Sequence, residues 1–109
     1  MTEITQEAIM AAVSTAKPFA LVILKKGPNY ESTGNLQIEH LKHIFTMRSE
    51  GQQLVTLPVT DSGEIAGIGL MATSKEEAIA LTAADPGVIA GRFTFEVMSC
   101  MGMPGDSVR

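Results

Sequence analysis

The order of hydrophobic and polar positions divides the first half of the chain into two helical segments and one extended segment. Apolar residues recur at helical spacing over residues 4–15, and a continuous apolar run of strand length follows over residues 18–25. Apolar offsets of three and four then predict an amphipathic helix that ends near Gly51. Its predicted apolar stripe comprises Leu36, Ile38, Leu41, Ile44, Phe45 and Met47. We expect the strand at 18–25 to be buried on both faces.

The second half of the chain is predicted to hold a β-hairpin, a helix and a final strand. Residues 54–59 and 65–72 are apolar runs joined by a short polar turn, which is the pattern of a hairpin. Because Pro58 cannot donate a ladder hydrogen bond, the first hairpin strand is expected at a sheet edge. Hydroxyl and acidic residues at 73–77 open a helix, and residues 92–97 alternate polar and apolar as in a strand with one core face.

Together these segments predict an α+β domain of the ferredoxin-like type, β-α-β-β-α-β, with a four-stranded antiparallel sheet and an extra N-terminal helix. Two helices cover only one face of such a sheet, but the first and third strands are apolar at nearly every position. A bare apolar face of this size requires a cover. We expect a homodimer packed sheet to sheet, and the N-terminal helix is the competing cover.

Length and composition indicate one globular domain. The 109 residues are 45% hydrophobic and 18% charged, which suits a single packed core. We expect an N-terminal helical extension at 1–17, the ferredoxin-like domain at 18–100, and a flexible methionine-rich tail at 101–109. The net charge of −4 and the scattered basic residues argue against a nucleic-acid partner.

The single cysteine and the composition of the N-terminus indicate the cellular compartment in which we expect the protein. Cys100 cannot form an internal disulfide, and it carries no nucleophile signature, so we interpret it as a packed thiol in a reducing compartment. The first residues are acidic rather than basic, and no stretch approaches about 18 consecutive apolar residues. We therefore expect a soluble, cytoplasmic protein without membrane contact.

Candidate acid/base chemistry is restricted because the chain has only two histidines, His40 and His43. His40 lies at the border of the predicted apolar stripe, so it could equally be an ordinary boundary histidine with its polar tip at the surface. Asp85 precedes Pro86, and N-capping of a short helical turn would by itself account for this aspartate. A metal site on the two histidines is disfavoured because a third ligand is lacking.

Three sequence motifs carry a resemblance to a known family. They are Glu39-His40-Leu41, the helix start at 73–78, and the Ala-Asp-Pro-x-x-x-x-Gly run within 83–91. With the order of elements over roughly residues 18–98, they resemble the YCII-related (YciI-like) family of the dimeric α+β barrel superfamily. The N-terminal extension, the loop at 27–35 and the methionine-rich tail depart from that family, which leaves the substrate class and the pocket shape open.

The resemblance implies a histidine–aspartate dyad made of His40 and Asp85. The superfamily includes muconolactone isomerases, and some family members are dehydrochlorinases of substituted hydroquinones. The implied activity is that of a lyase or isomerase on a ring, lactone or enol, with no metal or organic cofactor. General acid/base transfer of this kind supplies a rate factor of about 10² to 10⁴. The alternative is a non-catalytic dimeric module that binds a small metabolite in the same cleft.

Overall fold

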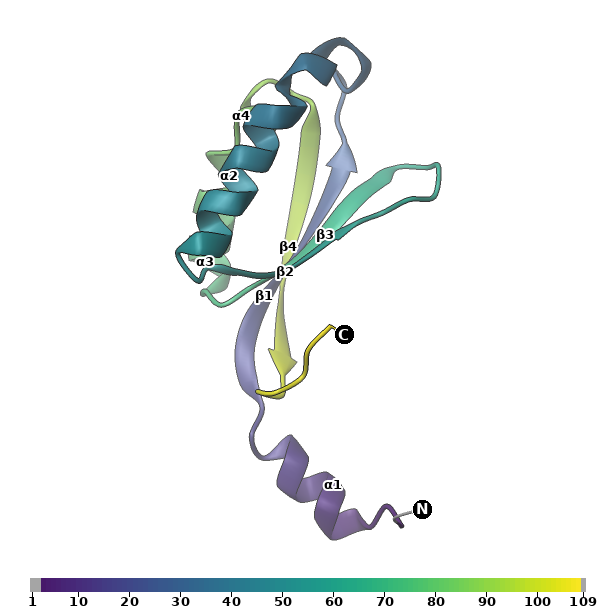
Figure 1. Ribbon diagram of the computed structural model, residues 1–109, viewed down its shortest axis with the longest axis vertical. Coiled ribbons are helices and arrows are strands. Elements are labelled where there is room, and N and C mark those ends of the chain that lie inside the picture. Colours follow the sequence, from purple (N-terminus) through teal and green to yellow (C-terminus); the bar gives the residue numbers. More distant parts are fainter. Residues whose placement is uncertain (1–2, 109) are drawn as a thin grey trace.

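The computed structural model describes residues 3–108 as a four-stranded antiparallel sheet with helices packed on one face (Figure 1). The strand order is β2-β3-β1-β4. No helix in this described part of the chain is long and apolar enough to cross a membrane. The elements are α1 (Gln6–Val13), β1 (Lys17–Lys26), the 3-10 helix η1 (Glu31–Leu36), α2 (Gln37–Ser49), β2 (Gln53–Pro58), β3 (Ile65–Met71), α3 (Lys75–Ala83), α4 (Pro86–Ile89) and β4 (Phe93–Gly102).

The central strand β1 pairs with β3 on one side and with β4 on the other. The hairpin β2–β3 is present as predicted, and β2 lies at the sheet edge, which confirms the position expected from Pro58. Strand β4 is longer than predicted. Met101 and Gly102, which we expected in the loose tail, pair with Pro18 and Lys17 because β1 is long enough to provide partners for them.

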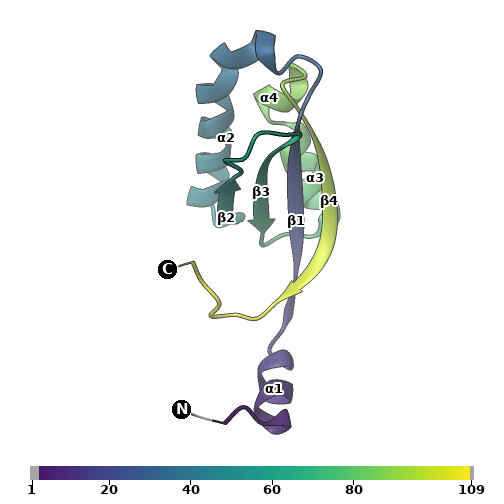
Figure 2. The same cartoon turned by 90° about the vertical axis from the view of Figure 1, so that its right-hand side faces the viewer.

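The two faces of the sheet differ in burial. Ala20 and Val22 point toward the helices and are buried, whereas Leu21 and Ile23 point to the outer face and are only half-buried. Figure 2 views the sheet from this outer side, and no helix lies in front of it. The prediction that the first strand is buried on both faces is therefore wrong for the single chain, because helices α2 and α3 pack on one face only.

Helix α1 does not serve as the cover for the outer face. It extends away from the end of the sheet, and none of its residues is buried (Figure 1). Its start agrees with a normal N-cap, since the hydroxyl of Thr5 accepts the backbone N–H of Ala8 at 3.1 Å. Ile9, Met10 and Val13 leave half or more of their surface exposed. An isolated helix of this length is marginally stable in water, and most short helices are stabilised by packing against other elements. Helix α1 lacks such packing within the single chain.

The buried side of α2 differs from the predicted apolar stripe. It consists of His40, Ile44 and Met47, which follow one another at helical spacings of four and three. Ile38 is 61% exposed and Phe45 is 57% exposed, so their expected burial is wrong. The physical reason is that the side of the helix carrying His40 contacts the sheet, and Ile38 and Phe45 are turned away from it.

The hydrophobic core lies between the helical layer and the inner face of the sheet. It is formed by small and medium side chains from β1, β3, α2 and α3, namely Ala20, Val22, Ile44, Met47, Met71 and Ala78. Helix α3 begins as predicted, with the Ser74 hydroxyl accepting the backbone N–H of Glu77 at 3.1 Å. These contacts fix α2 and α3 above the sheet and thereby position the residues described next.

Candidate active site

His40 and Asp85 meet in the interior of the protein. The Nδ1 atom of His40 lies 2.5 Å from Oδ2 of Asp85, although the residues are 45 positions apart in sequence. His40 is 6% exposed and Asp85 is 1% exposed. The structure thus places the two candidate residues in direct contact. The interpretation of His40 as a boundary histidine with a surface tip is wrong, because α2 turns this residue toward the sheet.

Asp85 is also the N-cap of α4. Its Oδ1 atom accepts the backbone N–H of Gly87 at 2.8 Å, and Pro86 occupies the first helical turn. One carboxylate oxygen therefore caps the helix, while the other contacts His40. Capping alone needs only one of these oxygens, so it does not account for the second contact. Both interpretations of Asp85 apply to the same side chain.

Phe93 packs against the His40 ring. The two ring centroids are 4.5 Å apart with an interplanar angle of 48°, and Phe93 is itself buried. A Cβ atom on Gly87 would lie 2.9 Å from Phe93 Cδ2 and 3.3 Å from Asp85 Oδ1. The absence of a side chain at Gly87 therefore leaves room for the aromatic ring and the carboxylate to pack together.

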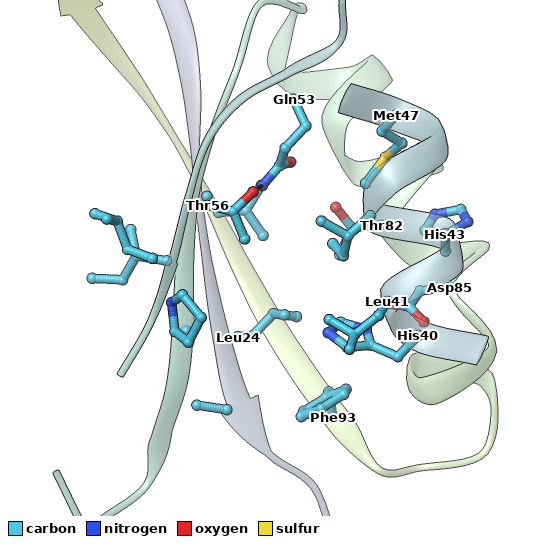
Figure 3. Close-up of a pocket in the computed structure, with 18 of the residues that line it drawn as sticks. Leu24, His40, Leu41, His43, Met47, Gln53, Thr56, Thr82, Asp85 and Phe93 are labelled. Carbon is cyan, nitrogen blue, oxygen red and sulfur yellow. Dashed lines mark hydrogen bonds and ion pairs between the residues drawn. The ribbon is translucent and has the colours of Figure 1, made fainter. Parts of the chain in front are cut away.

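A cavity of about 170 Å³ lies between α2 and the inner face of the sheet (Figure 3). Val22, Leu24 and Ile44 contribute to its largely apolar wall. Gln53 and Thr56 provide polar groups on the sheet side. The Gln53 Nε2 atom donates to the carbonyl oxygen of Val55 at 3.1 Å and to the Thr56 hydroxyl at 3.3 Å, which fixes the amide orientation.

The contact with Asp85 determines which nitrogen of His40 is available for chemistry. In the neutral imidazole, a carboxylate at Nδ1 favours the tautomer with the proton on that nitrogen, which leaves the lone pair on Nε2. No described residue forms a hydrogen bond with Nε2. The ring lines the cavity and extends toward the sheet in Figure 3. A ligand in the cavity can therefore reach the ring nitrogen of His40 that has no hydrogen-bond partner among the described residues.

His43 has a different partner. Its Nε2 atom lies 2.7 Å from the carbonyl oxygen of Leu81, to which it donates a hydrogen bond that joins α2 to α3. Within residues 3–108 there is no group of three or more histidine, cysteine, aspartate or glutamate side chains arranged to hold a metal ion. His40 and His43 thus have separate partners, one a carboxylate and the other a backbone carbonyl.

Cys100 lies on the opposite side of the sheet from the cavity. It pairs with Phe19 in the β1–β4 ladder, and its half-buried thiol lies 3.7 Å from the Phe19 carbonyl oxygen. On the same outer face, the hydrogen bond from Lys25 to Glu96, at 2.9 Å, raises the pKa of Lys25. Neither group contributes to the cavity.

Arg92 is a residue of the cavity wall that sequence reasoning missed. It is 6% exposed, and its Nε and Nη2 atoms donate to Gln37 Oε1 at 3.1 and 3.0 Å. Its Nη1 atom donates to the carbonyl oxygen of Tyr30 at 2.7 Å. A single arginine at the start of a strand has no periodic partner in the sequence, so no pattern distinguishes it from a surface cation.

Comparison of the sequence with profiles of known protein families gave no match, and comparison with curated proteins found none that is significantly similar. The physical evidence about function is therefore the arrangement within the chain itself. That arrangement consists of the buried contact between His40 and Asp85, the adjoining cavity, and the arginine in its wall.

Proposed function

We propose that the protein is a small-molecule lyase or isomerase in which His40 transfers protons and Asp85 orients it. The observation that carries this proposal is the 2.5 Å contact between His40 Nδ1 and Asp85 Oδ2, with the other side of the His40 ring facing a cavity. A nucleophile or base whose orientation is set by a third group is a recurring feature of active sites.

The proposed chemistry begins with proton abstraction by Nε2 of His40 from a carbon next to a carbonyl or lactone group. Asp85 stabilises the imidazolium that forms, because its carboxylate accepts a hydrogen bond from Nδ1–H and keeps its negative charge. In an isomerase, the proton returns to a different carbon and the double bond moves. In a lyase, a leaving group departs with its electron pair as the double bond forms. Neither route requires a metal or organic cofactor.

The cavity size supports a ring-sized substrate. Its volume of about 170 Å³ is similar to that of an apolar cavity of about 150 Å³ known to hold benzene. Apolar walls formed by Leu24, Leu41 and Met47 suit the faces of a ring, lactone or enol, and the Thr82 hydroxyl adds a polar group on the helix side (Figure 3).

We further propose membership of the YCII-related (YciI-like) family and a ferredoxin-like arrangement of the domain. The supporting observations are the sheet order, which reads β4-β1-β3-β2 from its other edge, and the two main helices on one face. The contact between His40 and Asp85 agrees with the dyad that the family resemblance implies.

The outer face of the sheet supports a homodimer of the dimeric α+β barrel type. Leu21, Ile23 and Leu70 are neighbours there across β1 and β3, and all three are half-buried in the single chain. Leu57 and Met98 widen the apolar area, with 47% and 44% of their surfaces exposed. Packing two such faces together would remove this apolar surface from water.

Deuterium exchange measured by NMR tests the proposed activity on small probe molecules in place of the natural substrate. The probes are α-angelica lactone, a cyclic 1,3-diketone and a chlorinated hydroquinone, each incubated with the protein in D₂O. For at least one probe, we expect the rate of deuterium incorporation, double-bond migration or chloride release to be higher with the protein than in buffer alone. Binding of probes in the cavity with no increase in any of these rates would instead support a metabolite-binding module.

A further inference from the structure

Arg92 carries a buried charge without an acidic partner among the described residues. The acceptors of its three hydrogen bonds are the neutral amide oxygen of Gln37 and the backbone carbonyl oxygen of Tyr30. A guanidinium has five N–H donors, so these bonds leave one N–H on Nη1 and one on Nη2. Burial of a charge is costly unless it is paired, and bonds to neutral acceptors compensate only part of that cost.

Two aromatic rings hold the guanidinium in place. The Arg92 Cζ atom lies 4.3 Å from the Tyr30 ring centroid and 5.2 Å from that of Phe93. Phe93 also contacts His40, so a single ring adjoins both the cation and the proposed base. Stacking of this kind fixes the plane of the guanidinium and reduces the entropy lost when a ligand binds to it.

The charges around the cavity are unevenly distributed. Of the described residues that line it, Arg92 is the one permanently cationic side chain and Asp85 is the one carboxylate. Because Asp85 is engaged with His40 and Gly87, it does not neutralise Arg92 through a direct contact. A negatively charged group on a ligand would therefore be attracted by Arg92 and repelled by Asp85.

We propose that Arg92 binds a carboxylate on the substrate, so that the cavity selects small organic acids and orients them with the reactive carbon toward His40. This inference deepens the proposed function by naming the substrate class for the same cavity. A guanidinium edge with one N–H on each terminal nitrogen matches the two oxygens of a carboxylate. A singly charged carboxylate also suits a site with one fixed cation better than a doubly charged phosphate does.

Benzoate and benzamide provide the direct test because they have nearly the same shape and differ in charge. Their dissociation constants are measured by titrating the isotope-labelled wild-type protein and following its amide resonances by NMR. We expect benzoate to bind about tenfold more tightly or better, with the largest shifts near Arg92 and Phe93. Equal affinities, tighter binding of benzamide, or no benzoate binding at tens of millimolar would overturn the proposal.

Two variants identify the cation responsible. Arg92→Gln should abolish the preference for benzoate, and Arg48→Gln is the matched control because Arg48 is exposed, stacks on Phe45, and does not line the cavity. Retention of the preference in Arg92→Gln would contradict the proposal. If Arg92→Gln fails to fold, the wild-type comparison of benzoate with benzamide still decides the matter.

Binding and turnover are separate readouts, so this proposal and the proposed activity can fail independently. Lactone turnover that depends on His40, together with equal binding of benzoate and benzamide, would refute the carboxylate site and leave the acid/base function intact. Preferential benzoate binding that depends on Arg92, with no turnover of any probe or of an unsaturated lactone that carries a carboxylate, would support the carboxylate site and refute the proposed catalysis.

Discussion

The carboxylate of Asp85 joins His40 to the start of helix α4. One oxygen lies 2.5 Å from His40 Nδ1, and the other accepts the backbone N–H of Gly87 at 2.8 Å. A rigid helix start therefore fixes the carboxylate, and the carboxylate fixes the imidazole. The Asp85 side chain is held by a backbone N–H, so its carboxylate has a fixed orientation. This favours a defined position for His40 Nε2.

Replacing Asp85 with asparagine should separate its capping role from its role toward His40. Asparagine caps helices well, and its carbonyl oxygen can still accept the Gly87 N–H. Its NH₂ group would then face His40 Nδ1 and favour the opposite tautomer, with the proton on Nε2. Since an equivalent change in a serine-protease triad lowers kcat by about 10⁴, we expect a loss of at least about 10² here. Steady-state kinetics beside a thermal melt measures both effects.

Asp85→Ala is the matched comparison because it removes both oxygens. We expect the free energy of unfolding to fall by about 3 kcal/mol or more, since the helix cap is lost together with one partner of a buried pair. Denaturant unfolding of the two variants gives the difference. Equal stability of Asp85→Asn and Asp85→Ala would show that the cap contributes nothing measurable.

Gly87→Ala should destabilise the protein and disturb the site. Alanine is the better helix former by about 1 kcal/mol, but its Cβ would lie 2.9 Å from Phe93 Cδ2. Gly34→Ala is the control, because a Cβ there meets nothing within 4 Å. Thermal melts should show a lower midpoint for Gly87→Ala and no decrease for Gly34→Ala. A Gly87→Ala protein as stable as wild type would mean that Phe93 moves aside without cost.

Leu70→Lys should weaken the proposed dimer. Leu70 lies opposite Leu21 on the outer face of the sheet, where a lysine would place a charge within the apolar interface. Ile38→Lys is the control, since Ile38 is exposed on α2, away from that face. Light scattering coupled to size-exclusion chromatography should give a dimeric mass for wild type and Ile38→Lys, and a monomeric mass for Leu70→Lys. A monomeric wild type at micromolar concentration would refute the dimer.

Local patterns were sufficient for most elements of the fold. The hairpin, the Ser74 cap and the edge position of Pro58 follow from turn chemistry and from the missing N–H of proline. The buried side of α2 was harder to predict because His40 occupies a position that a pattern search reserves for apolar residues. The full length of β4 depended on pairing with distant β1, which no local window contains.

The residues of the candidate site also differ in how far the sequence could predict them. His40 and Asp85 were candidates because the chain has few histidines and an Asp-Pro step marks a helix start, but only the family resemblance implied that the two residues form a pair. Arg92, Phe93 and Gln37 form their contacts only after η1, α2 and β4 have come together. These residues show no shared spacing in the sequence, so their grouping is a property of the tertiary structure.

The kcat/KM of the His40→Asn variant tests the central claim most directly, because this substitution removes the proposed proton-transfer group. Asparagine can keep a donor toward Asp85 in place of Nδ1–H, but it has no atom equivalent to Nε2. His43→Gln is the matched control, because glutamine retains a donor for the Leu81 carbonyl oxygen. With folding of both variants verified by circular dichroism, kcat/KM is measured on a probe that wild type converts. We expect His40→Asn to lose a factor of at least about 10² and His43→Gln to stay near wild type. A folded His40→Asn protein with wild-type kcat/KM would contradict the assignment of His40 as the acid/base group.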